Sequence, residues 1–156
     1  MPNSESHPES VSGRLAAFLT SHKDAIRDEW LTRIRRDLAT KTEKLTTEAL
    51  IDHLPQLFDD IIDALRHYRG ETVHEQMRRD AAAHATTRLQ QGYDLASLLR
   101  EIAHLRTIFI YHLRMFEESY PDFGMAARLF ADATVHRLLD ELTVDSAEQF
   151  LSGLQA

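Results

Sequence analysis

Residues 84–101 read HATTRLQQGYDLASLLRE, a stretch that indicates two helices joined by a tight turn. The residues on either side of the turn have helical character, Gly92 can stop the first helix, and Asp94 is a preferred cap for the next one. If the two helices fold back on each other, position 84 faces about position 101 and position 88 faces about position 97. The stretch therefore predicts a helical hairpin with charged side chains on its inner side.

Three of these side chains are predicted to hold the hairpin together. His84 and Arg88 are four residues apart, so they share one face of the first helix. Glu101 then lies within reach of His84, and Arg88 within reach of Ser97 or Glu101. Because buried charges are tolerated when they are paired, we predict that His84, Arg88 and Glu101 form a structural clamp. A ligand pocket is the alternative, and a histidine that titrates near neutral pH leaves open a switch function for the clamp.

Helical spacing of apolar residues extends over most of the chain, and no segment shows sustained period-two alternation. We therefore predict a flexible tail over residues 1–11 and a single all-α domain over residues 12–156, with about five to six helices and no sheet. The expected helices cover residues 13–19, 21–38, 46–69, 72–90, 94–118 and 122–156. Their expected caps are Ser21, Thr46, Gly70, Asp94 and Asp122, and Pro55 is expected to kink or restart the third helix.

Composition excludes several classes of protein. A net charge of −7 gives no electrostatic footprint for binding nucleic acid. The absence of cysteine excludes disulfides, thiolate nucleophiles and cysteine-ligated metal centres. No apolar run approaches the roughly 20 residues that span a bilayer, and the polar N-terminus has no signal-peptide pattern. We expect a cytoplasmic protein that binds neither nucleic acid nor a membrane.

The fifth expected helix is apolar over most of its circumference, and the last helix is similar. A helix of this kind is either buried centrally or also meets a second subunit. The last helix continues to Ala156 without a cap, which predicts that it runs on into an output domain beyond this sequence. We predict a homodimer, with the following residues as its expected face: Ile108, Tyr111, Met115, Leu138 and Leu142.

Nine histidines raise the hypothesis of a metal or haem cofactor. Glu71 with His74, and Glu101 with His104, have the Glu-x-x-His spacing of di-iron carboxylate bundles. The two further glutamates that such a site needs are missing from the apolar stripes, since the nominees Glu29 and Glu48 lie off them. The haem candidates are His104 and His112, which share one side of a helix. We predict no cofactor, and a haem- or di-iron-binding gas or redox sensor is the alternative.

Catalytic motifs are also absent from the sequence. His74-Glu75 resembles the start of a histidine-kinase phosphoacceptor box, but Arg79-Asp80 replaces the Thr/Asn-Pro that should follow. His67 lies in a segment whose spacing does not fit a phosphotransfer motif. There is no glycine-rich phosphate loop and no nucleophile elbow. We therefore predict a domain that is not an enzyme, with a histidine phosphotransfer module as a further alternative.

The arrangement His84-x-x-x-Arg88-x-x-x-Gly92-Tyr93-x-Leu95-x-x-Leu98-Leu99-x-Glu101-x-x-x-Leu105-Arg106 resembles the N-terminal domain family of RsbT co-antagonist (RsbRD) proteins. The segments HKDAIRDEWLTRI (22–34) and HLPQLFDDIIDAL (53–65) are also similar to that family, and the resemblance extends from about residue 12 to the end. It implies a globin-like fold that is dimeric and holds no haem. It further implies a sensory input domain that precedes a histidine kinase domain, or a STAS domain in stressosome proteins, in the same chain.

Overall fold

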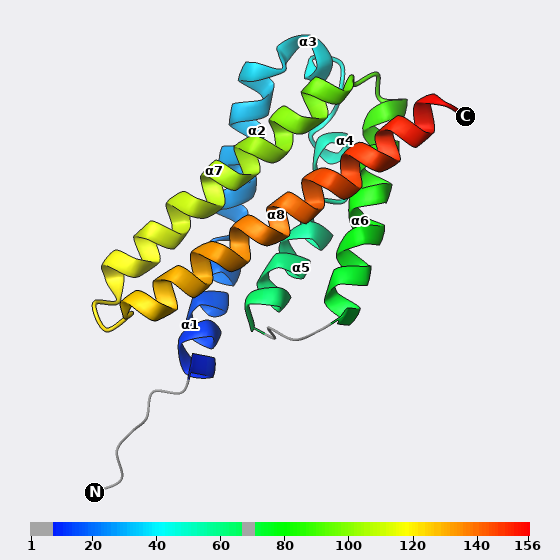
Figure 1. The fold of residues 1–156 in the computed structure, drawn as a ribbon. Coiled ribbons are helices and arrows are strands. Elements are labelled where there is room, and N and C mark those ends of the chain that lie inside the picture. The colour runs from blue at the N-terminus through cyan, green and yellow to red at the C-terminus, as the bar shows by residue number, and fades with distance from the viewer. Residues whose placement is uncertain (1–7, 67–70) are drawn as a thin grey trace, which may run out of the picture.

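The computed structural model describes residues 8–66 and 71–156, of which residues 8–12 and 71–74 are described by their backbone alone. Over these residues the chain forms helices and turns without a β-strand, which confirms the all-α prediction (Figure 1). The helices are α1 (Pro8–Ser21), α2 (Lys23–Asp37), α3 (Ala39–Thr42), α4 (Thr47–Ile51), α5 (Leu54–Arg66), α6 (Glu71–Gln90), α7 (Leu95–Ser119) and α8 (Met125–Leu154).

The two longest helices, α7 and α8, lie side by side across the front of the view in Figure 1. Helix α8 packs against α6 as well as α7, while α7 also packs against α2 and α1. Helix α5 fills the space between α1, α6 and α8. Because α7 packs against several helices of its own chain, its apolar surface is wider than that of a helix with one buried face. Its buried apolar residues are Leu98, Ile102, Leu105, Ile108, Phe109, Leu113 and Phe116.

The helix expected over residues 46–69 is broken before Pro55. Helix α4 begins after Thr46, whose hydroxyl accepts a hydrogen bond from the Ala49 N–H at 3.1 Å, as predicted for a cap. The chain then turns at Asp52, which has a φ of 31°, and α5 begins at Leu54. Pro55 therefore occupies the first turn of α5, where its missing N–H leaves no hydrogen bond unmade. The cap predicted at Gly70 lies outside the described residues.

The turn between α6 and α7 follows the prediction from residues 84–101. Gly92 has a φ of 85°, a left-handed conformation that glycine adopts without steric cost, and it ends α6. The Asp94 carboxylate then accepts a hydrogen bond from the Ser97 N–H at 2.8 Å and caps α7. This helical hairpin is the frame on which the buried charged residues lie.

Other helix boundaries differ from the prediction. Helix α1 begins at Pro8, inside the segment expected to be a tail, and it continues through Ser21, so His22 occupies the N-cap position of α2. The short helix α3 was not predicted. Helix α8 begins after Gly124 rather than at Asp122, because Phe123 first turns inward and packs its ring 5.1 Å from that of Phe116.

Candidate functional site

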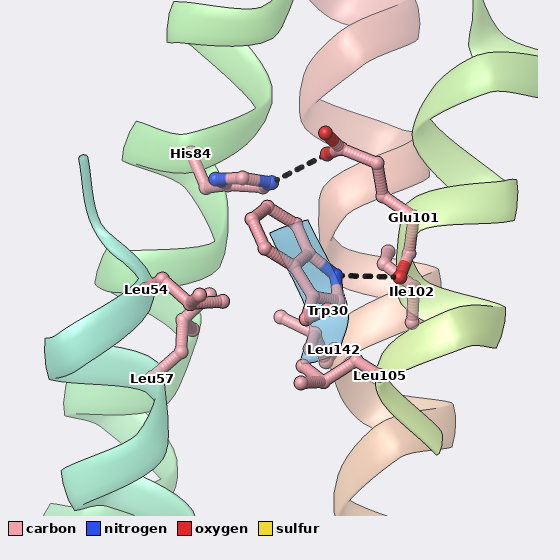
Figure 2. Close-up of a pocket in the computed structure, with 8 residues that line it drawn as sticks. All are labelled: Trp30, Leu54, Leu57, His84, Glu101, Ile102, Leu105 and Leu142. Atoms are coloured by element: carbon pink, nitrogen blue, oxygen red, sulfur yellow. Dashed lines mark hydrogen bonds and ion pairs between the residues drawn. The ribbon is translucent and has the colours of Figure 1, made fainter. Parts of the chain in front are cut away.

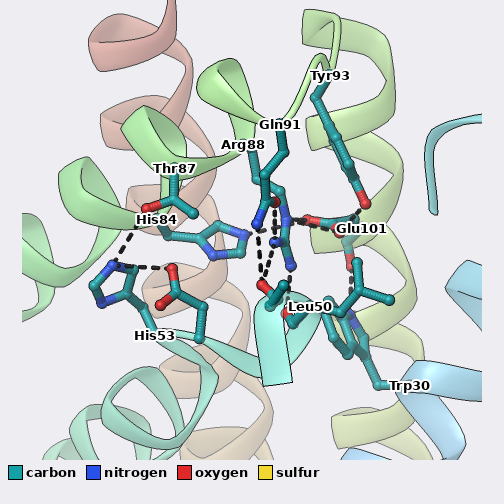
Figure 3. Close-up of polar contacts among 11 residues, drawn as sticks. Trp30, Leu50, His53, His84, Thr87, Arg88, Gln91, Tyr93 and Glu101 are labelled. Carbon is teal, nitrogen blue, oxygen red and sulfur yellow. Dashed lines mark hydrogen bonds and ion pairs between the residues drawn. The ribbon is translucent and has the colours of Figure 1, made fainter. Parts of the chain in front are cut away.

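The structure brings His84, Arg88 and Glu101 together inside the bundle, as Figure 3 shows. His84 and Arg88 come from α6, one turn apart, and Glu101 comes from α7. None of the three side chains is more than 4 % exposed. Helices α6 and α7 are joined by the short turn at Gly92, and polar side chains from both helices meet in one place inside the bundle.

The Glu101 carboxylate is the centre of this polar cluster. Arg88 Nε donates to both of its oxygens, at 3.0 Å and 2.9 Å. Tyr93 donates its hydroxyl to Oε1 at 2.7 Å, and His84 Nε2 donates to Oε2 at 3.2 Å. The carboxylate therefore receives hydrogen bonds from a guanidinium, a phenol and an imidazole, which is the compensation that a buried charge requires.

Arg88 also ties a third helix to the hairpin. Its Nη2 donates to the Leu50 carbonyl at 2.5 Å and its Nη1 to the Ala49 carbonyl at 3.3 Å. These carbonyls belong to the last turn of α4, where carbonyl groups have no partner within the helix and favour a cation. The guanidinium carbon also lies 5.2 Å from the centre of the Tyr93 ring, within the range of a cation–π contact. Arg88 is thus a C-terminal cap of α4 as well as the ion-pair partner of Glu101.

Trp30 connects α2 to the same polar cluster. Its indole N–H donates to the backbone carbonyl of Glu101 at 3.2 Å, and its ring lies beside His84 (Figure 2). Trp30 is 1 % exposed. A buried indole usually needs a partner for its N–H, and here the partner is the residue that carries the central charge. The polar cluster therefore connects α2, α4, α6 and α7.

The surroundings determine the protonation of this cluster. Burial acts to raise the pKa of Glu101, but the hydrogen bonds and charges of His84 and Arg88 together outweigh it, so the pKa lies below its usual value. The pKa of Tyr93 is raised, first because the phenol is buried and then because the Glu101 charge lies against it. Glu101 is therefore a carboxylate and Tyr93 a neutral hydrogen-bond donor at neutral pH.

The lowered pKa of Glu101 predicts a loss of stability in acid. A carboxyl whose folded-state pKa lies below its unfolded-state value stabilises the fold above the unfolded-state pKa, near 4.5. That stabilisation disappears as the pH falls through the folded-state pKa. We expect the difference in free energy of unfolding between the wild type and Glu101→Gln to be largest above pH 5 and to shrink below it. Urea titrations at several pH values measure it, and a difference that does not depend on pH would contradict the assignment.

The cavity beside the clamp is too small for an organic ligand. It measures about 10 Å³ and opens between Trp30, His84 and Glu101 on one side and leucine and isoleucine side chains on the other (Figure 2). This is about the space that one water molecule needs. His84 Nδ1 is buried and has no hydrogen-bond partner among the described residues. The geometry thus favours a clamp over the ligand pocket that the sequence left open.

The residues expected to form a dimer face are not on one surface. Ile108, Leu138 and Leu142 are at most 1 % exposed and pack in the core of their own chain. Tyr111 is 56 % exposed, and Met115 is half-buried. The prediction is therefore corrected for the three core residues, because other helices of the same chain, packed against α7 and α8, already cover the faces on which they lie.

The histidines considered as ligands are dispersed. His104 pairs with Asp37 near the surface at 2.9 Å, and the buried His112 donates from Nδ1 to the Ile108 carbonyl at 2.9 Å. Glu29 pairs with Arg33 on its own helix. Among the residues that the structure describes, no three histidine, aspartate or glutamate side chains are placed to hold a metal ion. The side chains of His67, Glu71 and His74 lie outside the described residues.

Besides Gln91, whose amide oxygen accepts from Arg88 Nη1 at 2.7 Å, sequence reasoning missed two buried members of the polar cluster. Tyr93 stands in the turn of the quoted stretch, next to Gly92, and its phenol could have been assigned as a donor to a buried carboxylate. Trp30 is the single tryptophan and lies on the apolar stripe of its helix, which signals a buried indole that needs an acceptor. The carbonyls of Ala49 and Leu50 carry no signal in the side-chain sequence, since any residue supplies a carbonyl.

Over the described residues the chain is thus an all-α bundle in which the buried charged residues His84, Arg88 and Glu101 bind one another. The chain belongs to the RsbT co-antagonist protein rsbRD N-terminal domain family, whose model matches residues 24–155. It is therefore a regulatory input domain of the stressosome type. No curated protein and no solved structure matches the chain. Within the described ranges, none of the helices combines the length and the apolar character needed to cross a membrane.

Proposed function

We propose that this chain is a non-catalytic sensory domain that forms a homodimer through α7 and α8 and passes a signal to a kinase or STAS domain. The observation that carries the dimer is the position of the exposed apolar side chains. Among the described residues, all large hydrophobic side chains that are exposed lie on α7, on α8 or in the turn between them. They are Tyr111, Tyr120, Met125, Leu129, Val144, Leu151 and Leu154.

The outer side of α7 and α8 suits a second copy of the chain. The two helices run along each other at the front of the bundle, and their other sides are packed against α1, α2, α5 and α6 (Figure 1). On α8, Met125 and Leu129 are four residues apart, and Val144 and Leu151 are seven apart, so each pair shares a helix face. Exposed apolar side chains that gather on one region mark an interaction site, and a two-fold symmetric dimer brings the same patch together from both subunits.

Signalling also requires an element with two packings of similar energy. The clamp supplies a discrete set of contacts between α6 and α7, and α8 packs against both of these helices. A change in the clamp would therefore alter the position of α8, which lies in the proposed dimer interface. This route connects a signal at the hairpin to the partner subunit without any chemical reaction.

We expect the wild-type domain to be a dimer at micromolar concentrations and the double variant Val144→Glu/Leu151→Glu to be a monomer. Two glutamates per chain place like charges opposite each other in an interface that must exclude water. Sedimentation velocity measures the mass, and circular dichroism checks that the helices remain. Gln56→Glu, which adds a charge on the exposed side of α5, is the matched control and should remain a dimer. A wild-type monomer at high micromolar concentration would overturn the proposal.

A further inference from the structure

A second buried acidic group lies between α5 and α6, apart from the clamp. Asp60 of α5 is 8 % exposed, and its carboxyl lies against that of Asp80 on α6. Both Oδ2 atoms are buried and have no hydrogen-bond partner among the described residues. An ionised carboxylate can only accept hydrogen bonds, so a bond between two carboxyl groups requires a proton on one of them.

The charged groups nearest to this carboxyl pair are acidic, so they do not stabilise a second negative charge on it. Besides Asp80, the groups that act most strongly on Asp60 are Asp63 and Asp59 of its own helix, and both are acidic. Gln76 donates to Asp80 Oδ1 at 3.2 Å, but it is neutral. On α2, Lys23 pairs with Asp59.

On the other helices packed against α5, the charged side chains of Arg14 and Asp145 interact with groups other than Asp60. On α1, the guanidinium of Arg14 lies 5.6 Å from the centre of the Tyr120 ring. On α8, Asp145 interacts with Arg78 of α6 and with the neighbouring acids Glu141 and Glu148. The charges that act most strongly on the Asp60 carboxyl are therefore all negative.

Burial raises the pKa of Asp60 to about 8, and the hydrogen bond and negative charge of Asp80 add to the effect. The direction agrees with the geometry, because two carboxylates in contact cannot both be ionised without strong repulsion. The pair thus retains a proton across the neutral range and releases it in mildly alkaline solution.

We propose that Asp60 and Asp80 share one proton and that this carboxyl pair is a pH-sensitive contact between α5 and α6. Release of the proton leaves two negative charges side by side and pushes the helices apart. Asp80, His84 and Arg88 follow one another at intervals of four residues, so they lie along one side of α6. Loss of the contact between Asp60 and Asp80 would therefore act on α6, the helix that carries His84 and Arg88 of the clamp. This inference does not depend on the proposed dimer.

The sign of the effect on stability follows from the raised pKa. The folded state holds a proton that the unfolded chain, with an ordinary aspartate pKa of 3.8, has already released at neutral pH. The stabilisation by the pair is complete below pH 3.8 and is lost as the pH rises through about 8. Its pH dependence is opposite to that of Glu101.

The test is a titration of the aspartate side-chain carboxyl carbons by NMR on the intact chain. We expect one aspartate to titrate near pH 8 in the wild type and none to do so in Asp60→Asn. The amide that this substitution introduces can donate to Asp80 without a proton from solvent. Asp122→Asn, at an exposed position in the turn before α8, is the control and should retain the alkaline step. Thermal melts from pH 6 to 9 should show a falling midpoint in the wild type and a flatter profile in Asp60→Asn.

A wild-type spectrum in which all aspartates titrate below pH 6 would overturn the proposal. So would a pH profile of the melting midpoint that is the same for the wild type and Asp60→Asn. If Asp60→Asn does not fold, Asp80→Asn removes the same pair from the other helix, and loss of the alkaline step in that variant supports the proposal. The wild-type titration alone decides whether the shared proton exists.

Discussion

Glu101→Gln is expected to lower the free energy of unfolding by about 3–5 kcal/mol, the usual cost of breaking a buried ion pair from one side. The substitution keeps the shape of the side chain but removes its charge. Arg88 is fully buried, and Glu101 supplies the carboxylate that pairs with it. The remaining acceptors of the guanidinium, the carbonyls of Ala49 and Leu50 and the Gln91 amide, are neutral. The arginine charge would remain buried without an opposite charge.

Urea unfolding followed by circular dichroism measures this loss. Glu118→Gln is the matched control, because Glu118 lies on the same helix but is exposed, and we expect it to change stability by less than about 0.5 kcal/mol. The double variant Arg88→Met/Glu101→Leu removes both charges and should recover part of the loss, since apolar residues can replace a buried ion pair. A Glu101→Gln variant as stable as the wild type would show that the pair does not hold the helices.

Trp30→Ala is expected to lower the free energy of unfolding by about 3–5 kcal/mol. The indole is fully buried and already borders a small cavity, so its removal enlarges a void that the surrounding helices cannot easily close. It also removes the donor to the Glu101 carbonyl. Trp30→Phe retains most of the apolar bulk and loses the N–H, so we expect it to cost about half as much.

Circular dichroism is the appropriate signal for these variants, because Trp30 is the single tryptophan and the substitutions abolish its fluorescence. Thr32→Ala, two residues further along α2 and exposed, controls for changes in helix propensity. Equal losses for Trp30→Phe and Trp30→Ala would assign the effect to the hydrogen bond with Glu101 instead of the packing of the ring.

Local signals in the sequence predicted the hairpin and its charged residues. Asp94 and Gly92 have side-chain and backbone preferences that act within a few residues, and the spacing of His84 and Arg88 fixes their common helix face. Pro55 indicated a break in the third helix, but its position depends on the turn at Asp52. Aspartate is common in turns, but several other aspartates of this chain lie within helices, so Asp52 alone did not mark the change. The role of α4 as a partner of Arg88 arises from tertiary packing, which these local preferences do not contain.

Three residues of the predicted dimer face lie in the core, and the physical reason is a different one. Ile108 and Leu138 lie on helices whose apolar residues extend over most of their circumference, a pattern that shows only that several sides are covered. Whether the cover belongs to the same chain or to another depends on the path of α1, α2 and α6, which approach from distant parts of the sequence. The apolar residues that remain exposed could therefore be identified only from the structure.

Because α8 is long and uninterrupted, a small rotation at one end of it produces a larger displacement at the other end. With 30 residues, the helix is about 45 Å long, and it is packed against α7 and α6. A tilt of about 5° around its first turn displaces its last turn by about 4 Å. A rotation of α8 is thus largest at Leu154, where it would also change the packing of the buried Phe150, and any segment joined to that end of the helix would move with it.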